Sequence, residues 1–187
     1  MNKIIKYSFL ALIFSNLVSI PAGAEVGAVS TATGGTGRGA VETVDGILLN
    51  PAFVSEFPTK TFSVNYSTDE WAMSVVDNGT DSYFPAGLVF ESAKSDTLDS
   101  QKLGIVLALP RWKKFVVGAN ISMVEYSDRT TLTEKNYRQV IGDVGMTFAV
   151  TRDIGIGLTS NKAGSNKIDL PENLQLQRTL GLGTSYT

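Results

Sequence analysis

The chain has 187 residues, of which 18% are charged, a formal net charge of −2, and neither histidine nor cysteine. The length is that of one domain, and the charged fraction is below the roughly 25% of soluble domains. Without histidine and cysteine, the usual hydrolytic triads, typical zinc sites and disulfide frameworks are excluded, and nothing in the charge balance favours nucleic acid. We therefore expect no enzyme activity, cofactor, metal ion or nucleic-acid partner.

Residues 1–24 have the features of a secretory signal peptide. Lys3 and Lys6 precede an apolar run, and Pro21 is followed by small residues up to Ala24. The run is shorter than a transmembrane helix and breaks at the proline, so the pattern predicts cleavage after Ala24. No later segment has 18 consecutive apolar residues, so an exported chain that stays in a membrane must cross it with strands.

Residues 25–58 form an N-terminal segment that is rich in glycine. Four glycines, of which Gly34 and Gly35 are the first two, occur within residues 34–39. A nucleotide-binding loop is excluded because the sequence Gly-Lys-Ser/Thr is missing and Glu42 stands where a dinucleotide fingerprint needs glycine.

Residues 59–187 alternate between apolar residues and small or polar residues, which is the period of β-strands. Ile121 and Met123 share one parity, for example, while Asn120 and Ser122 share the other. Eight strands are predicted in this way, over 61–67, 71–76, 84–92, 101–109, 114–126, 139–150, 154–160 and 176–186.

The second face of these strands is unusual for a soluble sheet. It consists mostly of Gly, Ser, Asn, Thr and Ala, and the long charged side chains gather in the loops. An antiparallel transmembrane barrel requires this arrangement, with the apolar parity facing lipid and the other parity facing the lumen. Inward glycines indicate tight curvature or the close approach of another segment. A soluble barrel with its apolar parity inside is the alternative.

Aromatic residues lie toward the ends of the predicted strands, where a headgroup zone would meet them. They are Tyr66, Trp71, Tyr83, Phe84, Trp112, Phe115, Tyr137 and Tyr186. Tyr126 falls on the inward parity and is not part of this set.

Gly34-Gly35, and Asn50-Pro51-Ala52 followed by an apolar residue, lie between the signal peptide and the first strand. This pattern, over roughly 33–57, resembles the N-terminal signature of FadL-type, PorV-like outer-membrane proteins. In that family the segment lies inside the barrel or across its periplasmic mouth, and the barrels pass hydrophobic compounds such as long-chain fatty acids. The resemblance implies that Asn50, Pro51 and Ala52 hold the segment in place. A turn that leads into the first strand is the alternative.

An eight-stranded barrel has an interior that its own side chains fill, so a plug of that length would not fit. Three alternatives remain: the segment sits at the mouth, other chains complete the barrel, or the chain is part of a longer one. The end of the sequence, Tyr186-Thr187, departs from the terminal aromatic residue with which the barrels it resembles usually finish.

Asp143 is the one ionisable residue near the middle of a predicted strand, and it is expected to face the lumen. We predict that it lies among lumen or ligand-contacting residues, which are Gln139, Asn120, Ser122 and Arg138. Its partner would be Arg138 or Lys102, because an isolated buried charge is costly. The pair either braces the barrel wall or lines a path for a ligand.

A pair of carboxylates is the remaining enzymatic option, as in glycoside hydrolysis. Asp143 would need Glu125 or Glu91 as its second group. Glu125 is expected to point outward, and no motif supports either pair, so an enzyme is not predicted.

The sequence thus predicts an all-β protein with a signal peptide (1–24), an N-terminal segment (25–58) and an antiparallel transmembrane β-barrel of about eight strands (59–187), with the segment at its mouth or in its lumen. The predicted location is the bacterial outer membrane, with lipid as a partner. The predicted function is binding or passage of small hydrophobic compounds. A structural or interaction barrel without transport activity, as a homo-oligomer or through its loops, is the alternative.

Overall fold

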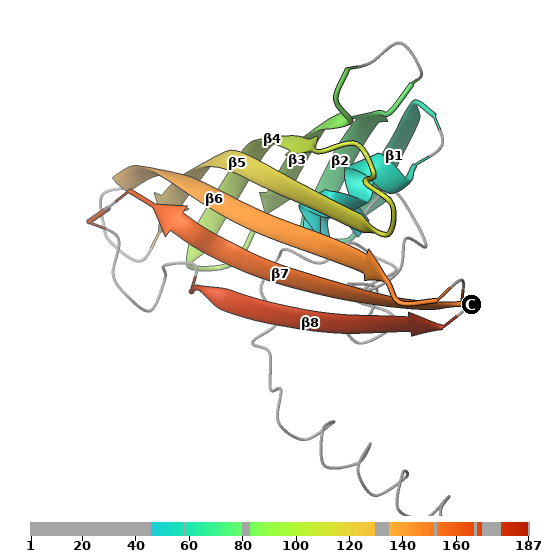
Figure 1. Ribbon diagram of the computed structural model, residues 1–187. Coiled ribbons are helices and arrows are strands. Elements are labelled where there is room, and N and C mark those ends of the chain that lie inside the picture. The colour runs from blue at the N-terminus through green and yellow to red at the C-terminus, as the bar shows by residue number, and fades with distance from the viewer. Residues whose placement is uncertain are drawn as a thin grey trace, which may run out of the picture.

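The computed structural model describes residues 46–57, 59–79, 83–129, 135–151, 153–166, 168–169 and 177–186. The predicted signal peptide, Gly34 and Gly35 lie outside these ranges. Two short helices precede one antiparallel sheet, whose strands follow one another in sequence order (Figure 1). The elements are α3 (Gly46–Leu49), η1 (Pro51–Glu56), β1 (Thr61–Tyr66), β2 (Glu70–Asp77), β3 (Ala86–Ala93), β4 (Leu98–Ala108), β5 (Phe115–Asp128), β6 (Lys135–Ala149), β7 (Ile154–Ser165) and β8 (Thr179–Tyr186).

The prediction of eight antiparallel strands is confirmed, and the main differences lie at the strand ends. β5 continues to Asp128 and β6 begins at Lys135, so both reach into the predicted loop between them. Pairs of polar side chains lie opposite each other across this extension, including Glu125 with Arg138. Such cross-strand pairs stabilise a ladder that an apolar pattern alone does not reveal.

The sheet is open, so the prediction of a closed eight-stranded barrel is wrong in this respect. Within the described residues, β1 pairs with β2 and β8 pairs with β7, and no pairing joins β1 to β8. Figure 1 shows a curved sheet with these two strands at its margins. A barrel of eight strands holds only its own side chains. Because the inner face of this sheet also holds α3 and η1, the margins could meet only by displacing that segment.

The apolar parity faces outward and the small or polar parity faces inward, as the sequence predicts. Ile121 is 66% exposed, whereas its neighbours Asn120 and Ser122 are buried. The soluble alternative, with the apolar parity packed inside, is therefore not the arrangement of these strands. Each strand carries at least one exposed large apolar residue, such as Phe62, Val75, Leu88, Ile105, Ile121, Val144, Leu158 and Leu182.

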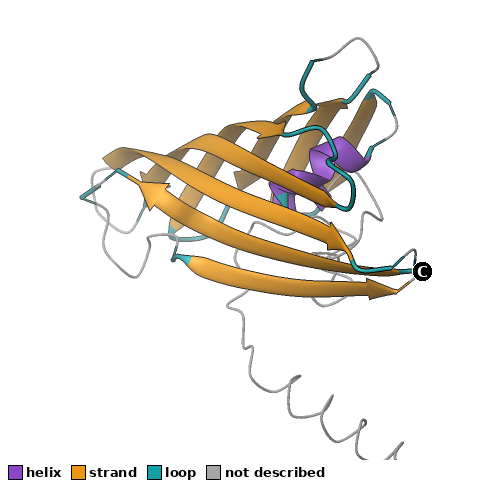
Figure 2. Cartoon of the chain, in the orientation of Figure 1, coloured by secondary structure: helices purple, strands orange, loops and turns teal. Residues whose placement is uncertain are grey.

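The two helices lie on the inner face of the sheet, near one of its ends (Figure 2). We call this the proximal end, where β1 begins at Thr61, and the opposite end, where Tyr66 pairs with Trp71, the distal end. Neither helix in the described residues has the length and apolar content needed to cross a membrane.

The inner face of the proximal half is a hydrophobic core between the helical segment and the sheet. Phe53 and Val54 of η1 are 1% and 0% exposed, and they belong to a cluster with Val76, Val106 and Val116 of the strands. Complete burial of such side chains contributes about 1.5–3 kcal/mol each. The segment is therefore an integral part of the fold.

Candidate functional site

Asn50, Pro51 and Ala52 begin η1 and bring it onto the inner face. The side-chain oxygen of Asn50 accepts a hydrogen bond from the backbone N–H of Ala52 at 3.1 Å, which caps the helix. Pro51 occupies the first turn, where a helix needs no backbone donor. Asn50 Nδ2 also donates to the carbonyl oxygen of Met146 in β6 at 3.3 Å. One short motif thus starts the helix and attaches it to the sheet.

Two glycines of the central strands form the surface on which this motif rests. A Cβ atom added to Gly118 would overlap the backbone of Pro51, and one added to Gly145 would overlap the side chains of Asn50 and Pro51. The sequence predicted that inward glycines permit the close approach of another segment, and the structure shows this at both positions. A larger residue at either position would force the segment or the strand to shift.

Further contacts hold the end of η1 to the proximal loops. Asn78 Nδ2 donates to the carbonyl oxygens of Ser55 at 3.0 Å and Phe57 at 2.6 Å. Glu56 forms an ion pair with Arg111. The segment is thereby attached both to the strands beneath it and to the connections at the sheet end.

The distal half of the inner face is polar and contains a buried ion pair. Lys102 Nζ lies 3.4 Å from Glu91 Oε1, and the two side chains are 8% and 10% exposed. The residues face each other across β3 and β4. Lys102 therefore forms its ion pair with Glu91 instead of with Asp143, the partner that the sequence had suggested. Glu91 is the closer partner because it lies directly opposite Lys102 in the ladder.

Asp143 is buried on the inner face, but it bonds to an amide side chain and a backbone N–H instead of to the predicted side chain of Arg138 or Lys102. Its carboxylate accepts hydrogen bonds from Asn120 Nδ2 at 2.8 Å and from the backbone N–H of Lys162 at 2.7 Å. Asn120 Nδ2 also donates to Ser122 Oγ at 2.8 Å. The structure therefore brings Asp143, Asn120 and Ser122 together as the sequence predicted.

The contact with Lys162 occurs at an irregularity between β6 and β7. The register shifts between Gly142 and Val144, and Lys162 has a positive φ of 51°. The Asp143 carboxylate bonds to a backbone N–H at this β-bulge, where regular pairing is interrupted. Sequence reasoning missed Lys162, since no local signal marks a bulge that depends on the partner strand.

Gln139 is also buried on the inner face and belongs to a neighbouring group. Its Oε1 accepts a hydrogen bond from the hydroxyl of Tyr126 at 3.3 Å, and its Nε2 donates to the carbonyl oxygen of Asn166 at 3.5 Å. Tyr126 packs with Val124 and Ile141, and Tyr137 packs against this cluster. Gln139 is therefore an inner-face residue with structural partners, and Tyr137 is packed inward instead of joining the outer aromatic residues.

Arg138 lies on the outer face, so its predicted position in the lumen is wrong. Its Nε donates to Glu125 Oε1 at 2.8 Å, and its side chain is 67% exposed. Arg138 has the same parity as the outward residue Val140. Glu125 points outward as expected, so it lies on the opposite face from Asp143 and the two cannot form a catalytic pair.

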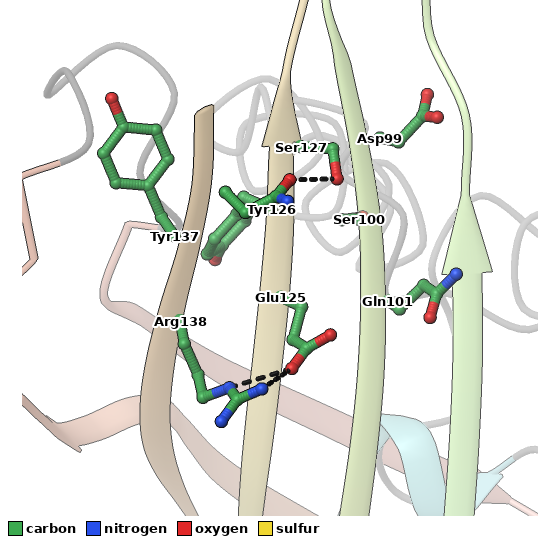
Figure 3. Close-up of a pocket in the computed structure, with 9 residues that line it drawn as sticks. Asp99, Ser100, Gln101, Glu125, Tyr126, Ser127, Tyr137 and Arg138 are labelled. Carbon is green, nitrogen blue, oxygen red and sulfur yellow. Dashed lines mark hydrogen bonds and ion pairs between the residues drawn. The ribbon is translucent and has the colours of Figure 1, made fainter. Parts of the chain in front are cut away.

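The Arg138–Glu125 pair borders a shallow hollow of about 450 Å³ near the distal ends of β4, β5 and β6 (Figure 3). Gln101, Asp99 and Tyr126 also line it. Its charged groups are already paired, since Arg138 bonds to Glu125 within the hollow and Asp99 pairs with Arg129, which lies outside the lining. The hollow therefore has no uncompensated charge that would select an ionic ligand.

Some inner-face polar atoms are buried without a hydrogen-bond partner in the described residues. They include Asn120 Oδ1, Ser74 Oγ and Thr159 Oγ1. Buried polar atoms usually bond to protein or to ordered water. Ordered water is therefore the natural hydrogen-bond partner for these atoms on the inner face. Across all the residues that the structure describes, no three acidic side chains lie close enough together to hold a metal ion.

Comparisons of the chain with family models, with curated proteins and with solved structures give no match. The resemblance of Asn50-Pro51-Ala52 to the FadL-type signature therefore remains a prediction.

Proposed function

We propose that this protein is an outer-membrane β-barrel protein that binds or passes small hydrophobic compounds. The observation that carries the proposal is the outer face, where apolar side chains are exposed on every described strand. Ile105 of β4, Ile121 of β5 and Leu182 of β8 are 56%, 66% and 67% exposed. Soluble monomers rarely expose apolar patches of more than a few hundred Å². Contact with lipid accounts for such a surface.

The height of this apolar surface supports the proposal. On β5 the outward residues from Phe115 to Met123 are apolar, and they extend about 27 Å along the strand. At a tilt of about 40° this corresponds to about 20 Å across a membrane, close to the roughly 25 Å apolar band of outer-membrane barrels. Beyond Met123, the outward residues become polar at Glu125 and Ser127, as expected where the headgroups begin.

Exposed aromatic residues lie at both ends of the band. Tyr66 and Trp71 are exposed at the distal end, and Phe84 and Trp112 are exposed at the proximal end. Aromatic rings with an apolar body and a polar edge favour the membrane interfaces. Their positions support an orientation of the strands across the bilayer.

The inner face supports a role in binding or passage. The helical segment covers its proximal half, while its distal half carries the buried ion pair and the Asn120–Asp143 group. A polar, small-residue lining is typical of barrel lumens. Under the proposal, the segment restricts the proximal opening and the polar half contacts water or the polar part of the compound.

The second candidate function is an interaction barrel without transport activity. The two unpaired margins of the described sheet favour it, since a sheet edge is a surface for adding strands from a partner.

Two measurements test these proposals in order. The expressed chain should be extracted from the membrane fraction only by detergent, and its gel mobility should change on boiling. A chain that is soluble without detergent would contradict both membrane functions. Liposomes containing the protein should then swell in solutions of small solutes, with a rate that falls as solute size increases. Absence of flux for every solute would leave the interaction barrel.

A further inference from the structure

The two margins of the sheet have backbone edges that no described strand covers. β1 pairs only with β2, and β8 pairs only with β7, among these residues. Natural sheets protect their edges with charged residues, proline or bulges. The sequences of β1, Thr61–Tyr66, and β8, Thr179–Tyr186, contain neither charged residues nor proline. Both edges are therefore able to pair with a further strand.

Both margins also belong to the apolar outer surface. Phe62 and Val64 of β1 are 61% and 55% exposed, and Leu180 and Leu182 of β8 are 80% and 67% exposed. In hydrocarbon, each unpaired backbone group costs several kcal/mol. A sheet that carries this surface into a membrane therefore needs a partner strand at each margin.

Closure within one copy is opposed by the contents of the inner face. The interior of an eight-stranded barrel is filled by its own side chains. Here Phe53 and Val54 are completely buried against β2, β4 and β5, and the backbone of Pro51 contacts Gly118. A pairing of β1 with β8 in the same copy would have to remove this core.

We propose that a second copy of this chain closes the barrel, with β8 of each copy paired to β1 of the other. Because neighbouring strands are antiparallel throughout the sheet, β1 and β8 run in opposite directions, and a two-fold arrangement forms two antiparallel seams. The barrel would have on the order of sixteen strands, a size that leaves a wide lumen. That lumen accommodates the helical segments of both copies. This inference rests on the proposed function, because the need for closed edges follows from insertion in a membrane.

The absence of cysteine from the sequence makes the seam directly testable. Val64→Cys and Leu182→Cys, both outward on the margins, are placed in two differently tagged copies that are expressed together. A short thiol-reactive cross-linker is then applied to the membrane fraction. We expect a product of twice the chain mass that carries both tags. Phe62→Cys and Leu180→Cys, tested in the same way, cover a shift of register along the seam.

A matched control uses Leu103→Cys in place of Leu182→Cys. Leu103 is also outward and 51% exposed, but it lies on β4, inside the sheet. Co-expressed with Val64→Cys, it should give no product, and a product here would show random association and overturn the inference. By light scattering, the unmodified protein in detergent should have twice the mass of its own denatured chain, which is 20.0 kDa before removal of the predicted signal peptide.

The outcomes separate this inference from the proposed function. A detergent-extracted chain that is monomeric and gives no product with any margin pair overturns closure by a second copy and leaves the membrane proposal standing. A cross-link within one chain of the Val64→Cys, Leu182→Cys double variant, without any product between chains, also overturns it in favour of closure in one copy. A chain that is soluble without detergent contradicts both.

Discussion

The proximal and distal halves of the inner face are built from the same strands but are stabilised by different interactions. Proximally, the inward residues are small or aliphatic, such as Gly118 and Val106, and a helical segment covers them. Distally, the inward residues of the same strands are Ser122 and Lys102, and they form hydrogen bonds and an ion pair. The difference shows that the type of inward residue depends on whether the helical segment covers that part of the sheet. Apolar packing stabilises the proximal half of the fold, and hydrogen bonds and an ion pair stabilise the distal half.

The largest expected effect is in the packed half. Phe53→Ala should lower the free energy of unfolding by about 4 kcal/mol, because it leaves a cavity between η1 and the sheet. Guanidinium unfolding in detergent, followed by tryptophan fluorescence, measures this. Phe84→Ala is the matched control, since Phe84 is 57% exposed, and its effect should stay within about 1 kcal/mol. Equal effects of the two substitutions would show that the segment is not packed as described.

The polar half is tested by removing one partner of its ion pair. Lys102→Met should lower the free energy of unfolding by about 3 kcal/mol, because Glu91 loses its cross-strand cation in a buried place. Adding Glu91→Leu should recover most of the loss. Arg138→Met removes one partner of the exposed pair with Glu125 and should cost less than about 1 kcal/mol. The same unfolding measurement applies, and a large effect at Arg138 alone would reverse the assignment of the two pairs to buried and exposed faces.

The boundary between the segment and the sheet is tested at a glycine. Gly145→Ala should lower the free energy of unfolding by about 2 kcal/mol, because the added methyl group overlaps Asn50 and Pro51. The control is Gly142→Ala in the same strand, where an added Cβ has its nearest neighbour at 3.8 Å. Protease digestion of both variants should release residues near η1 only in the first. Equal behaviour would place the segment elsewhere.

The smallest expected effect separates the two roles considered for Asp143. Asp143→Ala removes the acceptor for Asn120 and for the N–H of Lys162, so the free energy of unfolding should fall by about 1.5 kcal/mol. We expect the swelling rate of liposomes to be unchanged once the variant is folded, because both of these hydrogen bonds join the carboxylate to groups of the sheet itself. A changed rate or solute preference with normal stability would instead assign it to a path through the lumen.

The eight strands and their faces could be predicted because alternation is a local property. Ile121 and Asn120 differ in environment simply because successive side chains of a strand point to opposite sides. Closure of the sheet into a barrel could not be predicted in this way, since it depends on whether β1 pairs with β8, and these strands lie at opposite margins of the sheet.

In the candidate site, too, the face on which a residue lies could be predicted from the sequence, but contacts that depend on distant strands could not. Asp143 and Asn120 face inward by parity, and they meet because they are directly opposite each other in β5 and β6. The bulge that brings the backbone of Lys162 to Asp143 depends on a register shift in another strand, which periodicity does not contain. Arg138 was misplaced although its parity with Val140 indicated the outer face.

The hydrogen bond from Asn50 to Met146 joins residues separated by 96 positions in the chain. During synthesis, Asn50 precedes all eight strands, yet its binding surface on Gly118 and Gly145 forms only when β5 and β6 have paired. Contacts between such distant positions form slowly. The helical segment, which precedes the strands in the sequence, is thus among the last parts of the described fold to reach its place, and until then Phe53 and Val54 remain exposed to aggregation.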